Sequence, residues 1–198
     1  MIRLIPRLAV LAVLTVLAVL ALLPVPAALS SSAAEPAPAQ GPTGDAALQQ
    51  SIEQLRLSIG RWDVVTEFLN DDGSVARAAN GSYEFSWVVP DRVIAGKSAI
   101  PELGQVSGIL FYINPQKRII EMVSVGADGR LWVMTGPLGG EERTTAEFQT
   151  TTAGTAQMRF TRYNVANDKF ESRMEYTDDG GKSWKPGNHQ TFRRAAAS

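Results

Sequence analysis

The chain contains no cysteine and only one histidine, His189, among 198 residues. Without cysteine there is no disulfide framework, no thiolate nucleophile and no thiolate metal site. A single histidine excludes metal sites built from several imidazoles, and most catalytic triads become impossible unless His189 is the base. The sequence therefore offers few of the groups on which common enzymes depend. We expect no metal and no cofactor, and an enzyme is the weaker interpretation.

The chain also has no excess of positive charge. It holds 19 Lys and Arg against 20 Asp and Glu, a net charge of −1. Loss of an N-terminal leader that contains Arg3, Arg7 and no acid changes this to −3. Such a surface has no basic field, which argues against nucleic acid as the main partner.

Residues 1–34 have the parts of an export signal and the start of a linker. Two arginines precede an apolar run over residues 8–23, and prolines follow that run. A bilayer-spanning helix needs roughly 18 to 20 apolar residues, so a cleaved signal peptide is favoured over a retained anchor. Cleavage after Ala27 or after Ala34 fits equally well. We expect an extracytoplasmic protein, periplasmic or secreted, with no membrane span after cleavage.

The sequence after residue 34 indicates a short linker followed by one domain. Residues 35–44 are rich in Pro and Ala and predict a flexible linker, and residues 45–198 predict a single folded domain. Asp45 is a candidate helix N-cap. The spacing after it places four apolar residues on one stripe of a helix over residues 45–58, namely Leu48, Ile52, Leu55 and Ile59.

From Gly60 onward the hydrophobic period changes to two, which is typical of strands. Tight turns with Asn, Asp, Gly and Pro separate the runs, and no helical period lies between them. The predicted strands are 62–68, 82–87, 92–99, 107–113, 118–125, 130–135, 144–150, 157–165, 169–176 and 189–194. About ten such strands predict an all-β fold, a closed antiparallel up-and-down barrel with one N-terminal helix. Closure protects the sheet edges, and a two-sheet sandwich is the alternative.

Gly60-Arg61-Trp62, directly after the predicted helix, resembles the G-x-W signature of lipocalins and related calycin barrels. The resemblance implies that Trp62 plugs the closed end and that an arginine of the last strand lies across its ring. Arg193 and Arg194 both end that strand, and we take Arg194 as the partner of Trp62.

Further segments extend this resemblance over residues 55–194. Ser107-Gly108 with Tyr112, the stretch over residues 175–184, and the terminal Phe192-x-Arg194 resemble a family of uncharacterised exported bacterial proteins with a lipocalin-like barrel. That family implies fold and compartment but no activity. Nitrobindin-like barrels, which hold heme through a histidine, are a more distant comparison.

His189 is the candidate heme ligand in that comparison, since one imidazole and an apolar pocket suffice. Strand parity opposes it: if Phe192 points inward with Gln190, then His189 points outward. A bulge near Gly187 would reverse this parity.

The methionines and aromatic residues of the predicted strands suit the wall of a cavity for a small apolar molecule. They equally suit a filled core, because small barrels are often packed solid. The leading hypothesis is ligand binding, and the alternatives are a structural or protein-interaction module of the cell envelope, or a barrel isomerase or cyclase. Strand parity allows only some of the candidate lining residues to point inward together. They are Tyr83, Phe85, Trp87, Tyr112, Met122, Trp132, Met134, Met158, Phe160 and Met174.

Two acidic segments have structural interpretations. Thr177-x-Asp179-x-Gly181-x-Ser183-Trp184 fits the Asp-box hairpin of β-propellers, but it occurs once, and a propeller needs repeats. We therefore expect a stabilised β-turn. Glu141-Glu142 follow Gly139-Gly140 and are expected in a loop.

Overall fold

The computed structural model describes residues 44–150 and 154–196. The predicted export signal lies outside these residues, and of the predicted linker over residues 35–44 only Gly44 is described, where it begins the helix. Within the described residues, no helix is both long and apolar enough to cross a membrane.

The described residues form one long helix, a short 3-10 turn and a series of strands. The helix α1 spans Gly44–Ser58, and the 3-10 turn η1 spans Pro101–Leu103. The strands are β1 (Gly60–Leu69), β2 (Val75–Val89), β3 (Val93–Ile100), β4 (Gln105–Asn114), β5 (Ile119–Gly126), β6 (Leu131–Pro137), β7 (Glu142–Thr145), β8 (Phe148–Gln149), β9 (Thr155–Tyr163), β10 (Lys169–Thr177) and β11 (Lys185–Arg194).

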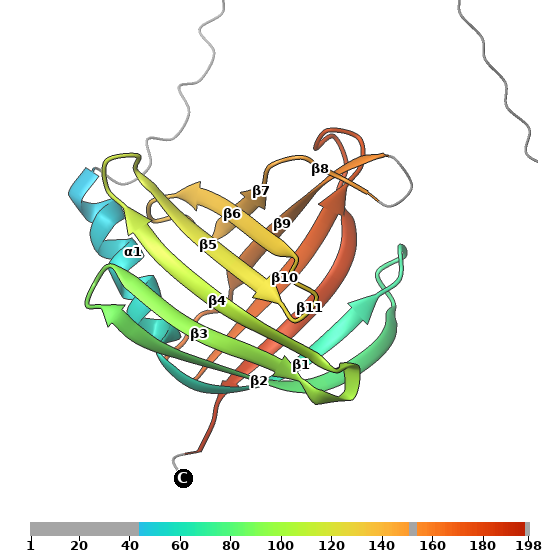
Figure 1. Ribbon diagram of the computed structural model, residues 1–198, viewed down its shortest axis with the longest axis horizontal. Coiled ribbons are helices and arrows are strands. Elements are labelled where there is room, and N and C mark those ends of the chain that lie inside the picture. Colours follow the sequence, from blue (N-terminus) through green and yellow to red (C-terminus); the bar gives the residue numbers. More distant parts are fainter. Residues whose placement is uncertain (1–43, 151–153, 197–198) are drawn as a thin grey trace, which may run out of the picture. The chain divides into compact units, whose positions relative to one another are not determined.

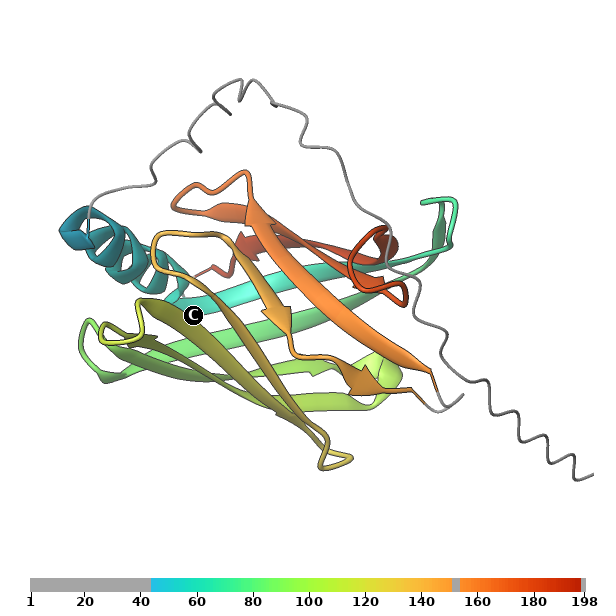
Figure 2. The ribbon, with the colours of Figure 1, turned by 90° about the horizontal axis from the view of Figure 1, so that it is seen from above.

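Ten of these strands close into an antiparallel barrel, as Figures 1 and 2 show. Strands β1 to β7 follow one another around the barrel, each paired with its neighbour in the sequence. Strand β7 then pairs with β9, β9 with β10, and β10 with β11. The pairing of β11 with β1 completes the ring. The predicted closed up-and-down barrel with one preceding helix is confirmed.

Strand β8 is the exception, because it lies outside the ring and pairs only with β9. The sequence predicted one strand over residues 144–150, and the structure divides that segment into β7 and β8. The Phe148 ring packs edge-on against the Trp132 ring, with centroids 5.0 Å apart. This contact holds β8 beside the barrel rim.

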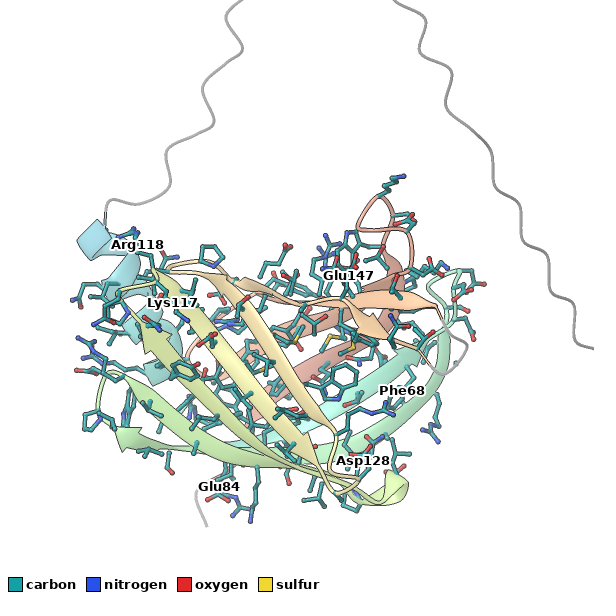
Figure 3. The ribbon with its side chains drawn as sticks, turned by 45° about the horizontal axis from the view of Figure 1, so that its top comes forward. Phe68, Glu84, Lys117, Arg118, Asp128 and Glu147 are labelled. Atoms are coloured by element: carbon teal, nitrogen blue, oxygen red, sulfur yellow. The ribbon has the colours of Figure 1, made fainter. Side chains whose placement is uncertain are left out.

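The alternation of side chains along the strands builds the core. In β1, Trp62, Val64 and Thr66 are almost completely buried, while Asp63 and Val65 between them are exposed. In β2 the outward Glu84, labelled in Figure 3, separates the inward Tyr83 and Phe85. Apolar residues therefore fill the inside of the ring, and charged residues cover its outside.

Helix α1 covers one end of the barrel, beside the loop that holds Lys117 and Arg118 (Figure 3). Ala47, Ile52 and Leu55 bury its apolar stripe in the core. Polar contacts fix the helix to the β6–β7 loop, because Ser51 Oγ accepts the Gly139 amide at 2.8 Å and Gln54 Nε2 donates to the carbonyls of Gly139 and Gly140.

Trp62 and Arg194 lie together at this covered end. The Arg194 guanidinium carbon is 4.2 Å from the centre of the Trp62 ring. Its nitrogens also donate to the carbonyls of Ile59, Leu57 and Asn167. Gly60 takes a positive φ of 108° here, and a side chain at that position would lie 2.7 Å from Arg194. The glycine therefore leaves room for the arginine.

The hairpin between β10 and β11 contains the single Asp-box sequence. Asp179 accepts hydrogen bonds from the amide and hydroxyl of Ser183 and from the Thr177 hydroxyl, the last at 2.7 Å. Gly181 has a φ of 85°. These contacts lower the pKa of Asp179, first of all through Ser183. The segment is a stabilised turn at the end of the barrel away from α1.

Candidate functional site

A cavity of about 180 Å³ lies inside the barrel, beneath helix α1. Its wall is mainly apolar and comes from α1 and from strands on all sides of the ring. The apolar and aromatic lining residues are Leu55, Tyr83, Phe85, Ile109, Phe111, Met122, Phe160, Phe170, Met174 and Phe192. The interior is therefore not packed solid.

Polar groups also face this cavity: Gln54, Ser58, Ser98, Ser107, Ser124, Arg143, Arg162 and Gln190. Some of them are occupied by bonds within the wall. Gln190 donates to Thr66 Oγ1 at 2.9 Å and to Tyr83 Oη at 3.3 Å. Gln54 Nε2 serves the β6–β7 loop, whereas Gln54 Oε1 is buried without a partner among the described residues.

Arg162 is one of two buried arginines at the cavity, and each of its three guanidinium nitrogens has a hydrogen-bond partner. Its Nε and Nη2 donate to the two carboxylate oxygens of Glu141, at 2.8 and 3.0 Å. Nη1 donates to the carbonyl of Gln54 and to Ser58 Oγ, both at 3.2 Å. Such a bidentate pair is strong and geometrically specific. Glu141, expected in a solvent-exposed loop, therefore serves as the counter-ion of an interior arginine.

Arg143 is the second buried arginine, with 3% of its surface exposed. None of its guanidinium nitrogens makes a hydrogen bond or an ion pair with any residue in 44–150 or 154–196, and Nε is completely buried without a partner. Its guanidinium carbon lies 5.6 Å from the centre of the Phe111 ring. A buried charged group in this state calls for an explanation, because such groups are normally paired.

The electrostatic setting of Arg143 reflects this lack of a partner. Burial lowers the pKa of Arg143 to about 10, the nearby Arg162 cation adds to the effect, and the Glu141 carboxylate opposes it. This pKa is still well above neutral pH, so the guanidinium stays charged inside the barrel. The cavity therefore contains a cation with no hydrogen-bonded or ion-paired partner among the described residues.

The neighbouring strand is shaped to accommodate this side chain. Gly136 lies beside Arg143 in the sheet, and a Cβ at position 136 would come within 3.1 Å of Arg143 Cγ and 2.1 Å of the Glu142 carbonyl oxygen. Glycine is the residue that permits this close approach. The absence of a side chain at 136 leaves room for the arginine stem.

Five of the ten predicted lining residues border the cavity: Tyr83, Phe85, Met122, Phe160 and Met174. Four others have the same inward parity but lie elsewhere along the barrel: Trp87, Trp132, Met134 and Met158. Trp87 packs against the core, and Met134 is buried between strands. Trp132 and Met158 lie toward the end away from α1, where Trp132 contacts Phe148 and Met158 pairs with Tyr176.

The assignment of Tyr112 to the cavity wall is wrong. Its strand neighbour Phe111 lines the cavity, so Tyr112 points to the outer face. There it pairs across the sheet with Glu121, and a hydrogen bond to that carboxylate raises the pKa of Tyr112.

His189 also lies on the outside of the barrel. Its Nδ1 is 2.9 Å from Glu67 Oε2, and its ring stacks on Tyr163. The pairing of β10 with β11 is irregular at Gly187, as the sequence allowed, but it is regular from Asn188 onward. His189 and Phe192 therefore point to opposite faces of the sheet, and His189 points outward. The only imidazole of the chain therefore does not reach the cavity. No group of three or more candidate metal ligands occurs among the residues described.

Sequence reasoning missed the charged part of the site. Arg162 follows Met158 and Phe160 at steps of two in one predicted strand, so the three side chains lie on the same face of that strand. This spacing was a signal that Arg162 points inward. Arg143 gave no such signal, because the predicted strand began at Thr144.

Comparisons with known proteins assign neither a family nor a function to the chain. No protein-family model matches the chain, and no curated protein matches its sequence. Among solved structures, it is similar to a redesigned beta barrel, b11L5F_LGL, with 14% identity, a TM-score of 0.38 and coverage of 72% of this chain and 95% of that one. It is similar to EF1p2_mFAP2b bound to DFHBI, with 16% identity, a TM-score of 0.35 and coverage of 74% and 98%. It is also similar to the S-type phycobiliprotein lyase CPES from Guillardia theta, with 11% identity, a TM-score of 0.46 and coverage of 80% and 100%. These values are too low to carry a ligand or an activity over to this chain.

Proposed function

We propose that this protein binds a small, largely apolar molecule inside its barrel. The observation that carries the proposal is the cavity of about 180 Å³ beneath α1, which aromatic and methionine side chains line. A ligand that fills this cavity removes its apolar walls from water and makes dispersion contacts with them.

The volume limits the size of the ligand. Pockets for drug-sized molecules start near roughly 300 Å³, so this cavity is too small for a lipid or for heme. An apolar cavity of about 150 Å³ accepts benzene. The 180 Å³ available here therefore suits a molecule with one aromatic ring or a short branched chain.

Export completes the proposal. The N-terminal sequence has the pattern of a cleavable signal, and the chain has no cysteine that an oxidising compartment could affect. We infer that the protein works outside the cytoplasm as a member of the exported lipocalin-like family. A fusion to a reporter that is active only after export tests this, and a reporter that stays inactive contradicts it.

Methionine NMR tests the binding proposal directly. Met122 and Met174 border the cavity, whereas Met134 and Met158 do not, so the four methyl groups contain their own control. With ¹³C-methyl methionine in the purified protein, toluene is expected to shift the signals of Met122 and Met174 in a saturable way. Signals that stay unchanged up to the solubility limit of toluene would contradict small-ligand binding.

A second candidate, a protein-interaction module, is favoured by the outer face of strands β4 to β6. Val106, Val125, Leu131 and Val133 are 41–58% exposed, and Val125 pairs directly with Leu131. Such an outward apolar surface is common at protein contacts. This candidate gains over ligand binding if a purified envelope partner reduces hydrogen exchange in these strands while the cavity methionines respond to no small molecule.

A further inference from the structure

We propose that the ligand of the barrel carries a carboxylate and that Arg143 binds it. This inference rests on the proposed function, and it adds the chemical class of the ligand.

The first step is the charge inside the barrel. Among the residues that border the cavity, only Arg143 and Arg162 carry a full charge at neutral pH. Glu141 forms two hydrogen bonds with Arg162 but none with Arg143, which it reaches only by a longer-range attraction. One positive charge, that of Arg143, is left over. An anion of the ligand would neutralise it.

The second step is geometry. Arg143 Nε is buried without a hydrogen-bond acceptor, and no hydrogen bond from Nη1 or Nη2 occurs among the described residues, although only 3% of the residue is exposed. A guanidinium offers parallel donors that match the two oxygens of a carboxylate. Arg162 and Glu141 show the same pairing a short distance away in this barrel. Arg143 has the donors for a second such pair but no acceptor.

The third step is the character of the remaining wall. Phe111 lies against the Arg143 guanidinium, and Phe85, Phe160 and Phe170 border the same space. An inorganic anion would leave these rings without contacts, whereas an aromatic carboxylate satisfies both the cation and the rings. The volume of 180 Å³ accommodates one ring with its carboxylate. Benzoate is the simplest probe of this class.

The test compares benzoate with toluene, which has the same ring but a methyl group in place of the carboxylate. Both are titrated into the ¹³C-methionine protein, and Met122 and Met174 report occupancy. The variants are Arg143→Met, which removes the cation, and Arg193→Met, which removes an exposed outward arginine and serves as the matched control. Sodium chloride and sodium phosphate at equal ionic strength show whether an inorganic anion suffices.

Benzoate is expected to bind the parent protein and the Arg193→Met control equally well. Because hydrogen bonds to a charged group contribute about 1.5 to 3 kcal/mol, Arg143→Met should weaken benzoate binding by roughly 10- to 100-fold. Toluene affinity should change by no more than about 3-fold, since it makes no use of the charge. If Arg143→Met does not fold, Arg143→Lys takes its place as the test variant. It keeps the charge but loses the paired donors of the guanidinium, so it should weaken benzoate binding less than 100-fold and leave toluene binding intact.

The outcomes separate the two proposals. Toluene binding without benzoate binding, or equal benzoate binding with and without Arg143, overturns the carboxylate inference and leaves the proposed function standing. Saturation by chloride or phosphate alone, with no added shift from benzoate, also overturns it. If neither toluene nor benzoate shifts the cavity methionines, both proposals are wrong.

Discussion

Replacement of Arg143 by methionine should make the ligand-free protein more stable. Burial and the Arg162 cation lower the pKa of Arg143 to about 10, so the folded state disfavours the charged form by about 3 kcal/mol. Methionine fills similar space without a charge. Loss of the contact with Phe111 offsets part of the gain. We expect a net increase of roughly 1 to 3 kcal/mol in the free energy of unfolding.

The sign of this effect follows from proton binding. The folded protein releases the Arg143 proton at lower pH than the unfolded chain does, because the folded pKa is the lower one. The unfavourable contribution is therefore complete below pH 10 and declines as the pH rises above about 10 toward the ordinary pKa of arginine. At pH 7 the charged Arg143 therefore destabilises the parent protein by its full amount.

Urea denaturation at pH 7 measures the change, and Arg162→Met is the matched comparison. Arg162 has a carboxylate partner, so its loss leaves Glu141 unpaired and should destabilise the protein by roughly 2 to 4 kcal/mol. The two substitutions remove the same group from neighbouring places and should change stability in opposite directions. If Arg143→Met destabilises the protein as Arg162→Met does, Arg143 is already satisfied without a ligand, and the reasoning fails.

Three further predictions concern the cavity, the covered end and the turn. Ser124→Leu should fill part of the cavity and abolish the toluene-induced shift of Met122, while circular dichroism shows an unchanged fold; a retained shift would place the ligand elsewhere. Arg194→Ala should lower the free energy of unfolding by roughly 1 to 2 kcal/mol, because the contact with Trp62 and the hydrogen bonds to three carbonyls are lost. The stability of Arg194→Lys should lie between that of the parent protein and that of Arg194→Ala. Equal stability of all three proteins would refute this role. Asp179→Asn should destabilise the protein at neutral pH. Because the pKa of the Asp179 carboxyl lies below the ordinary 3.8, the difference in stability between parent and variant should shrink as the pH falls below 3.8. Thermal melts of both proteins at pH 7 and pH 2.5 measure this difference, and a difference independent of pH contradicts the prediction.

The barrel itself was predictable because its signal is local. Inward residues such as Trp62, Val64 and Thr66 alternate with polar ones, and turns separate the strands at regular intervals. Every such run reports its own strand without knowledge of its neighbours. The number of strands and their closure followed from these separate signals.

The site was less predictable, because it depends on where each strand lies along the barrel. Five predicted residues reach the cavity, but others with the same inward parity, such as Met134, are at a different height. Tyr112 was assigned wrongly because residues 109–113 are apolar without interruption, which hides the period of two.

The two interior arginines illustrate the limit most clearly. Nothing in the sequence joins Glu141 to Arg162, because 21 residues separate them and only the pairing of β7 with β9 brings them together. Whether an arginine has a partner is a property of the assembled barrel. The unpaired state of Arg143, on which the ligand proposal rests, becomes visible only in three dimensions.

A crystal structure of the protein grown with benzoate tests the central claim most directly. We predict electron density for one aromatic ring among Phe85, Phe111 and Phe160, with both carboxylate oxygens within hydrogen-bonding distance of the Arg143 guanidinium. A cavity that contains only ordered waters bonded to Arg143, at a benzoate concentration high enough to saturate the crystal, would contradict the account.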